Sequence, residues 1–409
     1  MNPETTEEHL PLGPPKVAVD SSIRELAPNV LKLIEQLLTK KRTSTEKSLL
    51  ASVKHIQHFS GIRSNQTGLC KPELGVIGFL EKIIEETKGV IRMMACCAVR
   101  NLSSHPENAT ILCCADNSLV EVLVDTLDES AGFKIEDAES SMADLSGVGG
   151  SGDGDGEDEA EDERIDGEAN LAVGARFTGG EDSRVLLCEI FYNLSLSKAT
   201  VLYLRSDYLN LVRVLIEIVL QDDGETRMSA IKVLFNLSKN PDDNLFDLLN
   251  NTHLDKPHLR LFELLVDIVR YSRGKPRKMA LMILMNLIGH GHEGLKRLAS
   301  APLLYLPAAL IETILRGTQE DKILAMKCVY SLLTLHENAV AFGEPQLNVV
   351  NTLMHVIQSD KGKARALACA SVVRLCIREN RWGPLISLIS LISLTSLFIP
   401  FYPLYSIYP

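Results

Sequence analysis

Three Asn-Leu-Ser triplets are the residues of this chain whose types and spacing most directly suggest a chemistry. They begin at Asn101, Asn193 and Asn236, and each matches the Asn-x-Ser acceptor pattern for N-glycosylation. The N-terminal segment MNPETTEEHLPLGPPK is acidic and rich in proline, and it lacks the apolar core of a secretory signal. We therefore expect the chain to be cytoplasmic, nuclear or both, where these asparagines receive no sugar.

The nine cysteines do not follow a metal-binding or disulfide pattern. Two adjacent pairs, Cys96-Cys97 and Cys113-Cys114, fit neither the Cys-x-x-Cys spacing of zinc sites nor a small disulfide framework. We interpret the thiols as reduced, small core residues.

Two further patterns resemble metal sites but lack the residues that such sites need. His290 and His292 have no cysteines nearby and are interpreted as loop residues. A calcium-binding EF-hand loop starting at Asp153 needs glycine at its sixth place and glutamate at its twelfth, where Asp158 and Arg164 stand. The sequence also lacks the P-loop, GxSxG and HExxH motifs. We therefore expect a non-enzymatic protein with no cofactor, no metal and no small-molecule substrate.

The triplets belong to a longer internal repeat. When the Asn of each triplet is taken as position 0, a basic residue stands at position −9 and a leucine at position +1. The same register is found in six segments, whose position-0 residues are Asn101, Asn193, Asn236, Asn286, Ser331 and Arg374. From Asn193 onward the copies are 43, 50, 45 and 43 residues apart.

Each copy has the pattern of an amphipathic helix of about 14 residues, because positions +1, −2, −3 and −6 share one side and are apolar or small. Another apolar helical stretch precedes each copy, and a shorter one often precedes that. No alternating strand pattern appears between them. The repeating unit is therefore one short and two longer helices.

In period, in its three helices and in the NLS-type end of the third helix, the chain resembles the armadillo repeat family. The resemblance covers roughly residues 72–380, and residues 22–60 look like a degenerate capping repeat. It implies an all-α, right-handed superhelical solenoid of about six to seven repeats with a concave groove. HEAT repeats share this architecture but normally have two helices per unit.

One long acidic insert interrupts this array. Residues 130–182 hold 16 Asp and Glu residues against three basic residues, which leaves the rest of the chain at a net charge of +2. The expected organisation is a disordered segment at 1–21, repeats over 22–129, the disordered insert over 130–182, repeats over 183–380 and a hydrophobic tail over 381–409. The insert is either a solvated tether or a regulator that competes with partners for the groove.

In the family, third helices line the groove and their asparagines bind the backbone of an extended ligand. An amide suits this role because it carries both donors and an acceptor. The alternative is that each asparagine bonds the neighbouring helix end or loop. Asn101, Asn193, Asn236 and Asn286 match, whereas Ser331 and Arg374 depart from the pattern, so amide recognition is expected only in the first four copies.

Two further rows lie beside the asparagines. Position −1 carries Arg100, Tyr192, Phe235, Met285, Tyr330 and Val373, and position −4 carries Cys97, Glu189, Lys232, Met282, Lys327 and Ala370. Aromatic residues make up 5% of the chain, so three aromatics at position −1 suggest a partner surface, and the alternative is partial burial by the adjacent repeat. The predicted partner-binding residues are Arg100, Asn101, Tyr192, Asn193, Lys232, Phe235, Asn236, Met285, Asn286, Lys327 and Tyr330.

Several relatives within the family are not matched. Importin alpha carries tryptophan at position −4, whereas the single tryptophan here is Trp382, and the long basic groove of beta-catenin is not evident. Nucleic acid is not an expected partner, since the charge outside the insert is near zero. The basic residues at position −9 lie opposite the asparagines and are predicted to contact carbonyls or carboxylates at a preceding helix end.

After Arg381 the composition changes to 28 residues without charge. The uninterrupted apolar run over 385–399 has 15 residues, fewer than the roughly 20 that a membrane span needs. The tail is interpreted as a segment foreign to the native protein, as a membrane anchor or as an unusual cap.

Taken together, the residues predict a scaffold or adaptor that binds extended segments of partner proteins along the groove, with the acidic insert as a modulator. The alternative is an armadillo adaptor tethered to a membrane by the tail.

Overall fold

The computed structural model describes residues 46–114, 118–130, 180–239, 261–289, 306–342 and 347–379. Within these ranges all regular structure is helical and no strand occurs, which confirms the all-α prediction. The chain divides into two compact units, residues 1–237 and 238–409, and each unit is described by itself. The predicted segment 1–21, the tail 381–409 and most of the acidic insert lie outside the described residues.

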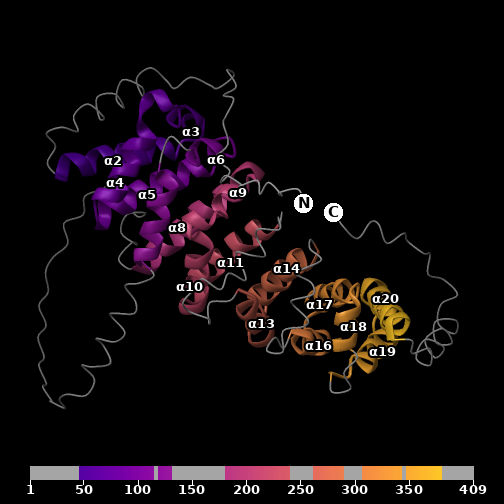
Figure 1. Ribbon diagram of the computed structural model, residues 1–409. Coiled ribbons are helices and arrows are strands. Elements are labelled where there is room, and N and C mark those ends of the chain that lie inside the picture. The colour runs from indigo at the N-terminus through magenta and orange to yellow at the C-terminus, as the bar shows by residue number, and fades with distance from the viewer. Residues whose placement is uncertain are drawn as a thin grey trace, which may run out of the picture. The chain divides into compact units, whose positions relative to one another are not determined.

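The first unit repeats a short helix followed by two longer ones (Figure 1). An additional helix, α2, precedes these repeats and packs on the third helix α5 as a further third helix. The elements are α2 (Glu46–Ser60), α3 (Arg63–Leu69), η2 (Pro72–Leu74), α4 (Val76–Glu86), α5 (Gly89–Ser103), α6 (Asn108–Leu112), a helix over 119–130, α8 (Gly180–Leu194), α9 (Lys198–Leu204), η4 (Asp207–Leu209), α10 (Leu211–Gln221) and α11 (Gly224–Ser238).

The second unit continues the same order of helices. Its third helices lie next to one another, α14 against α17 and α17 against α20 (Figure 1). The elements are α13 (Leu261–Tyr271), α14 (Lys275–Gly289), α16 (Leu306–Arg316), α17 (Gln319–Leu332), α18 (His336–Phe342), α19 (Val349–Ser359) and α20 (Gly362–Glu379).

The repeat register places the core as the sequence predicts. The leucine at position +1 is at most 3% exposed in all six copies: Leu102, Leu194, Leu237, Leu287, Leu332 and Leu375. Position −6 holds alanine in five copies and Leu187 in the other, and all six are at most 1% exposed. Small side chains at this position let neighbouring helices approach closely, while the leucines fill the space between them.

A turn in the left-handed region separates the second helix from the third in four copies. Gly89, Gly224, Gly274 and Gly362 all stand at position −12 and have φ between 52° and 68°. This region costs most other residues free energy because of their Cβ atom, so glycine is favoured there. The copy at α17 instead begins with a capping box, in which Thr318 and Asp321 each bond the backbone of the other.

The helices extend slightly into the predicted insert. The helix over 119–130 includes residue 130, and α8 starts at Gly180 rather than at 183. In the described residues, no helix is long and apolar enough to cross a membrane. Nor does any group of three His, Cys, Asp or Glu residues in those ranges have a geometry that could hold a metal ion.

Candidate functional site

The third helices carry the candidate binding surface. We define the third-helix face as the residues at positions −1, −4 and −8 of α5, α8 and α11 in the first unit, and of α14, α17 and α20 in the second. These positions share one side of a helix. The position-0 side chains lie at the edge of the face.

The position-0 asparagines bond the preceding repeat through their side-chain amides. Asn193 Nδ2 donates to Ser103 Oγ at 3.1 Å, and Asn236 Nδ2 donates to Ser195 Oγ at 3.0 Å. In the second unit, Asn286 Nδ2 donates to Ser238 Oγ at 3.0 Å. Each accepting serine is the third residue of an Asn-Leu-Ser triplet, so the triplet both gives and receives a bond between repeats.

The first copy shows the same bond with a different partner. Asn101 Nδ2 donates to Ser60 Oγ at 3.2 Å, and Ser60 is the last residue of α2. This contact places α2 in the register of the third helices, although it lacks an Asn-Leu-Ser triplet. Within the range of the predicted cap, α2 therefore packs in the place of a third helix.

The serines are oriented to accept. Ser60, Ser103 and Ser195 donate their own hydroxyl hydrogens to a carbonyl three residues earlier, at 2.8, 2.9 and 2.7 Å. The last carbonyls of a helix lack intrahelical partners, so these bonds satisfy one of them. Each hydroxyl then presents its lone pairs to the incoming asparagine, which fixes the direction of the whole chain of bonds.

A second set of bonds closes the end of the third helix. The carbonyl at position +1 accepts from a side chain six residues later: Asn65 to Phe59, Asn108 to Leu102, Thr200 to Leu194 and Asn338 to Leu332. The two fully buried asparagines, Asn108 and Asn338, make this bond at 2.9 Å. The side chain thus substitutes for the missing helical donor and ties the following short helix to the third helix.

The last copy replaces the amide with a guanidinium. Arg374 donates from Nη1 to the Tyr330 carbonyl at 2.8 Å and from Nη2 to the Tyr330 hydroxyl at 2.7 Å. Its Cζ lies 3.6 Å from the centroid of the Tyr330 ring, a cation–π contact. The position-0 residue therefore still contacts the preceding repeat, although the Asn–Ser chemistry is gone.

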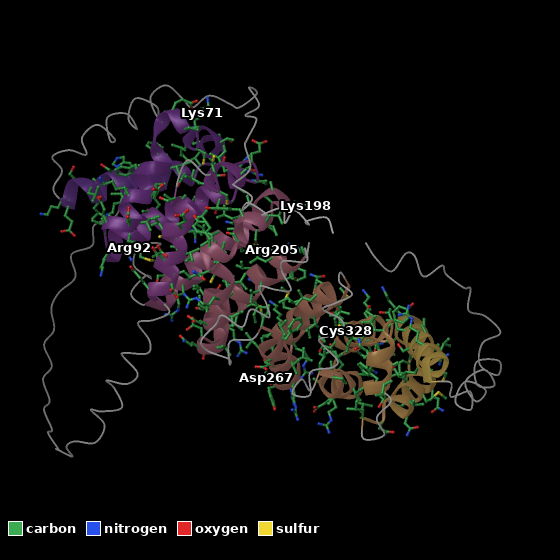
Figure 2. All side chains as sticks on the ribbon, viewed as in Figure 1. Lys71, Arg92, Lys198, Arg205, Asp267 and Cys328 are labelled. Carbon is green, nitrogen blue, oxygen red and sulfur yellow. The ribbon has the colours of Figure 1, made fainter. Side chains whose placement is uncertain are left out.

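Three of the basic residues at position −9, Arg92, Arg184 and Arg365, contact the end of the preceding second helix, as predicted. Arg184 Nη1 donates to the Ser130 carbonyl at 2.7 Å, and Arg365 Nε to the Asp360 carbonyl at 2.8 Å. Arg92, labelled in Figure 2, likewise donates from Nε to the Thr87 carbonyl. These carbonyls lie at the negative end of a helix dipole, which favours a cation.

Cations at position −9 also pair with a carboxylate at the second helix of the next repeat. Arg184 Nε lies 2.8 Å from Asp222 Oδ2, and both side chains are 3% exposed. Lys322 Nζ lies 2.8 Å from Asp360 Oδ2. Position −9 therefore joins repeats on one side of the third helix, and position 0 joins them on the other.

The position −1 side chains are half-buried rather than fully exposed. This holds for Arg100, Tyr192, Phe235, Met285 and Tyr330. Arg100 Nη1 pairs with Glu189 Oε2 of the next third helix at 3.3 Å. Because this pair is a third or more exposed on both sides, it contributes little to stability and remains accessible to a competing ligand.

Position −4 differs strongly between copies. Cys97 is buried, Lys232 is exposed and Lys327 is half-buried. Burial lowers the pKa of Lys327, and the nearby charge of Lys363 lowers it further. The predicted residues Lys232 and Lys327 therefore stand in different electrostatic surroundings.

Position −8 is a row that the sequence analysis missed. Met93, Val185 and Met228 in the first unit and Ile323 in the second are half-buried apolar side chains on the third-helix face. The sequence contains the pattern that identifies this row, since these apolar residues all stand eight positions before position 0. They supply apolar surface beside the charged position −4.

The structure thus gives the predicted residues two kinds of surroundings. The asparagines at the edge are engaged with neighbouring serines, and Asn236 is 2% exposed. The side chains at positions −1 and −4 lie on the partly open part of the face. Whether the asparagines also hold a ligand backbone stays a prediction.

The thiols in the third helices are not poised for chemistry. Burial raises the pKa of Cys96, Cys188 and Cys328 to about 12. Cys328, labelled in Figure 2, lies inside α17 and donates to the Leu281 carbonyl. A thiol with such a pKa is a poor nucleophile at neutral pH.

Comparison with known proteins gives a fold. No family model matches the sequence, and no curated protein matches it. Among solved structures, the chain is similar to a computationally designed armadillo repeat protein for modular peptide recognition, with 13% identity and a TM-score of 0.50 over 74% of this chain and 99% of that one. An engineered protein matches at 15% identity and a TM-score of 0.48 over 89% and 85% of the two chains. The register, the three-helix unit and the first of these likenesses define an armadillo-type helical repeat protein.

Proposed function

We propose that this chain is a non-enzymatic interaction scaffold that binds extended segments of partner proteins along its third-helix face. The observation that carries the proposal is the repeated position −1 row, where successive third helices present half-buried Arg100, Tyr192 and Phe235 in one register. Aromatic and arginine side chains are the residues that most often anchor a binding partner.

Different positions of the third helix have different roles, and this separation supports an extended ligand. Asn–Ser bonds at position 0 and cation contacts at position −9 hold consecutive third helices together. Positions −1, −4 and −8 are then left to vary from copy to copy, as expected where each repeat meets a different part of one segment. The solved armadillo neighbour was designed for modular peptide recognition, which agrees with this class of ligand.

The acidic insert enters the proposal as a modulator. Its charge allows it to compete with acidic partner segments, and its removal is then expected to strengthen their binding. The proposed location is the cytoplasm or the nucleus. No observation on the described residues favours the membrane-tethered alternative, and the tail that suggested it lies outside them.

The test compares two aromatic positions of the first unit. Tyr192→Ala combined with Phe235→Ala removes the anchors, and Tyr208→Ala removes an aromatic side chain that is 59% exposed on η4, outside the third helices. Quantitative affinity purification should lose partners with the double variant and retain them with the control. Circular dichroism and thermal melting should show that both variants fold.

A photo-crosslinking amino acid at position 192 gives a second readout, with position 208 as its control. Crosslinks to partner peptides should form at 192 and not at 208. Equal partner recovery from the double variant, together with equal crosslinking at both positions, would mean that the third-helix face is not the binding surface.

A further inference from the structure

Charge is distributed unequally between the two units. The described ranges of the first unit outside the acidic insert, 46–114, 118–129 and 183–237, hold 14 Lys and Arg against 16 Asp and Glu. The ranges 261–289, 306–342 and 347–379 of the second unit hold 13 Lys and Arg against 8 Asp and Glu. The net charge outside the acidic insert is therefore near zero because the negative charge of the first unit offsets the positive charge of the second.

Part of this positive charge lies on the third-helix face of the second unit. Lys278 and Lys327 stand at positions −8 and −4, and Lys275 and Lys363 stand one helical turn earlier, at position −11. Glu320 is paired with Lys278 at 2.5 Å, and Asp321 is 3% exposed within its own capping box. The carboxylates of Glu320 and Asp321 thus already have partners within the chain.

Lys275, Lys327 and Lys363 form no ion pair with any residue that the structure describes. Lys327 is also half-buried, and its pKa is lowered first by desolvation and then by Lys363. A partly desolvated cation beside a like charge is unfavourable in the free protein. An anionic group placed between the two ammonium groups would remove this penalty, and such local conflicts are typical of binding sites.

Apolar side chains surround these lysines. Met282 and Met285 of α14 and Ile323 of α17 are half-buried on the same face. Methionine side chains adapt to ligands of different shapes because they are unbranched and polarizable. The face therefore combines apolar surface with lysines that, apart from Lys278, have no ion-pair partner among the described residues.

We propose that this face binds an acidic extended segment of a partner protein. The carboxylates of the segment bind Lys327 and Lys363, and its apolar side chains pack on Met282, Met285 and Ile323. The inference rests on the proposed function and specifies the chemistry of the ligand for one of the two units.

An acidic peptide fits the face better than a nucleic acid does. Binding of single-stranded nucleic acid relies on aromatic side chains on which bases stack. The aromatic residue of this face, Tyr330, has Arg374 packed 3.6 Å from the centroid of its ring and bonded to its hydroxyl. The apolar residues match peptide side chains instead.

The experiment measures fluorescence anisotropy of three labelled probes with the full chain. The first is an octapeptide of alternating Glu and Leu, the second replaces Glu with Lys, and the third is a thymidine dodecanucleotide. The acidic peptide should bind most tightly, with an affinity that falls as the salt concentration rises.

Four variants locate the site. Lys327→Glu and Lys363→Glu should each weaken binding of the acidic peptide by about tenfold or more. Lys198→Glu reverses an exposed lysine of the short helix α9, which is not part of the third-helix face, and should change the affinity by less than about twofold. Lys327→Met should also lose binding while leaving the urea unfolding midpoint unchanged or higher, because it removes an unfavourable charge without creating a cavity.

The inference fails if the Lys-containing peptide or the oligonucleotide binds as tightly as the acidic peptide. It also fails if Lys198→Glu weakens binding as much as Lys327→Glu does. Either result leaves the proposed scaffold function standing, because that function is tested separately by the Tyr192 and Phe235 variants in the first unit.

Discussion

Asn236 and Ser195 occupy equivalent triplets in consecutive repeats, and the amide of the first donates to the hydroxyl of the second at 3.0 Å. The Ser195 hydroxyl in turn donates to the Tyr192 carbonyl at 2.7 Å. One triplet therefore holds a donor for the repeat before it and an acceptor for the repeat after it. The sequence pattern that resembles a glycosylation signal is the joint between repeats.

The hydrogen bond between Asn236 and Ser195 predicts that their contributions to stability are coupled. Asn236→Ala and Ser195→Ala should each lower the free energy of unfolding by about 1–2 kcal/mol, because each leaves a buried polar group with one bond fewer. The double variant should cost less than the sum, with an interaction energy of about 1 kcal/mol. Urea unfolding of the wild type, the two single variants and the double variant measures this interaction energy. Strictly additive losses would show that the hydrogen bond does not couple the two repeats.

The buried ion pair between Arg184 and Asp222 predicts a larger effect. Asp222→Asn leaves the 3%-exposed guanidinium without its counterion and should lower the free energy of unfolding by about 3–5 kcal/mol. Glu189→Gln breaks the accessible pair with Arg100 and should cost at most about 1 kcal/mol. Chemical denaturation compares the two, and similar losses would contradict the assignment of Arg184 to a structural role.

Two glycines of the first unit predict changes of opposite sign. Gly89 has φ of 63° and Gly78 lies inside α4, and no atom lies within 4 Å of a Cβ added at either. Gly89→Ala should destabilise the protein by about 1–2 kcal/mol because of its backbone conformation. Gly78→Ala should stabilise it by about 0.5–1 kcal/mol because alanine favours a helix. Shifts of the same sign in urea unfolding would rule out the left-handed turn.

Thiol reactivity should follow burial. Cys114 and Cys369 are half-buried, whereas Cys70, Cys188 and Cys328 are buried with pKa values raised to about 12. In the native protein at mildly alkaline pH, iodoacetamide should modify Cys114 and Cys369 first. Because the folded pKa of a buried thiol exceeds its unfolded value of 9.0, stability should be complete below that pH and fall as the pH rises from there toward about 12. Rapid native modification of Cys188, followed by mass spectrometry, would contradict its burial.

The repeat could be predicted from the sequence because it depends on local periodicity. A helix that buries one side must repeat leucine and small residues at fixed spacing, so Leu102 and Leu194 identify the core side without any knowledge of the neighbours. The contacts of Arg184 were also predictable, since a cation at a helix start needs a negative partner. The face at position −8 was in the same register, but Met93 and Met228 are apolar residues that sequence alone assigns to the core as readily as to a surface.

The sequence by itself determined an all-α armadillo-type repeat, its register and its buried residues, because these follow from the spacing of side chains along single helices. Only the tertiary structure decided that Asn193 bonds Ser103 and that Arg374 covers Tyr330, because each bond joins residues from different helices. It also decided that Lys327 lies near Lys363 and has no carboxylate partner among the described residues, since charge pairing depends on which helices pack together. Contacts between repeats are set by packing, and packing is where the candidate site acquires its chemistry.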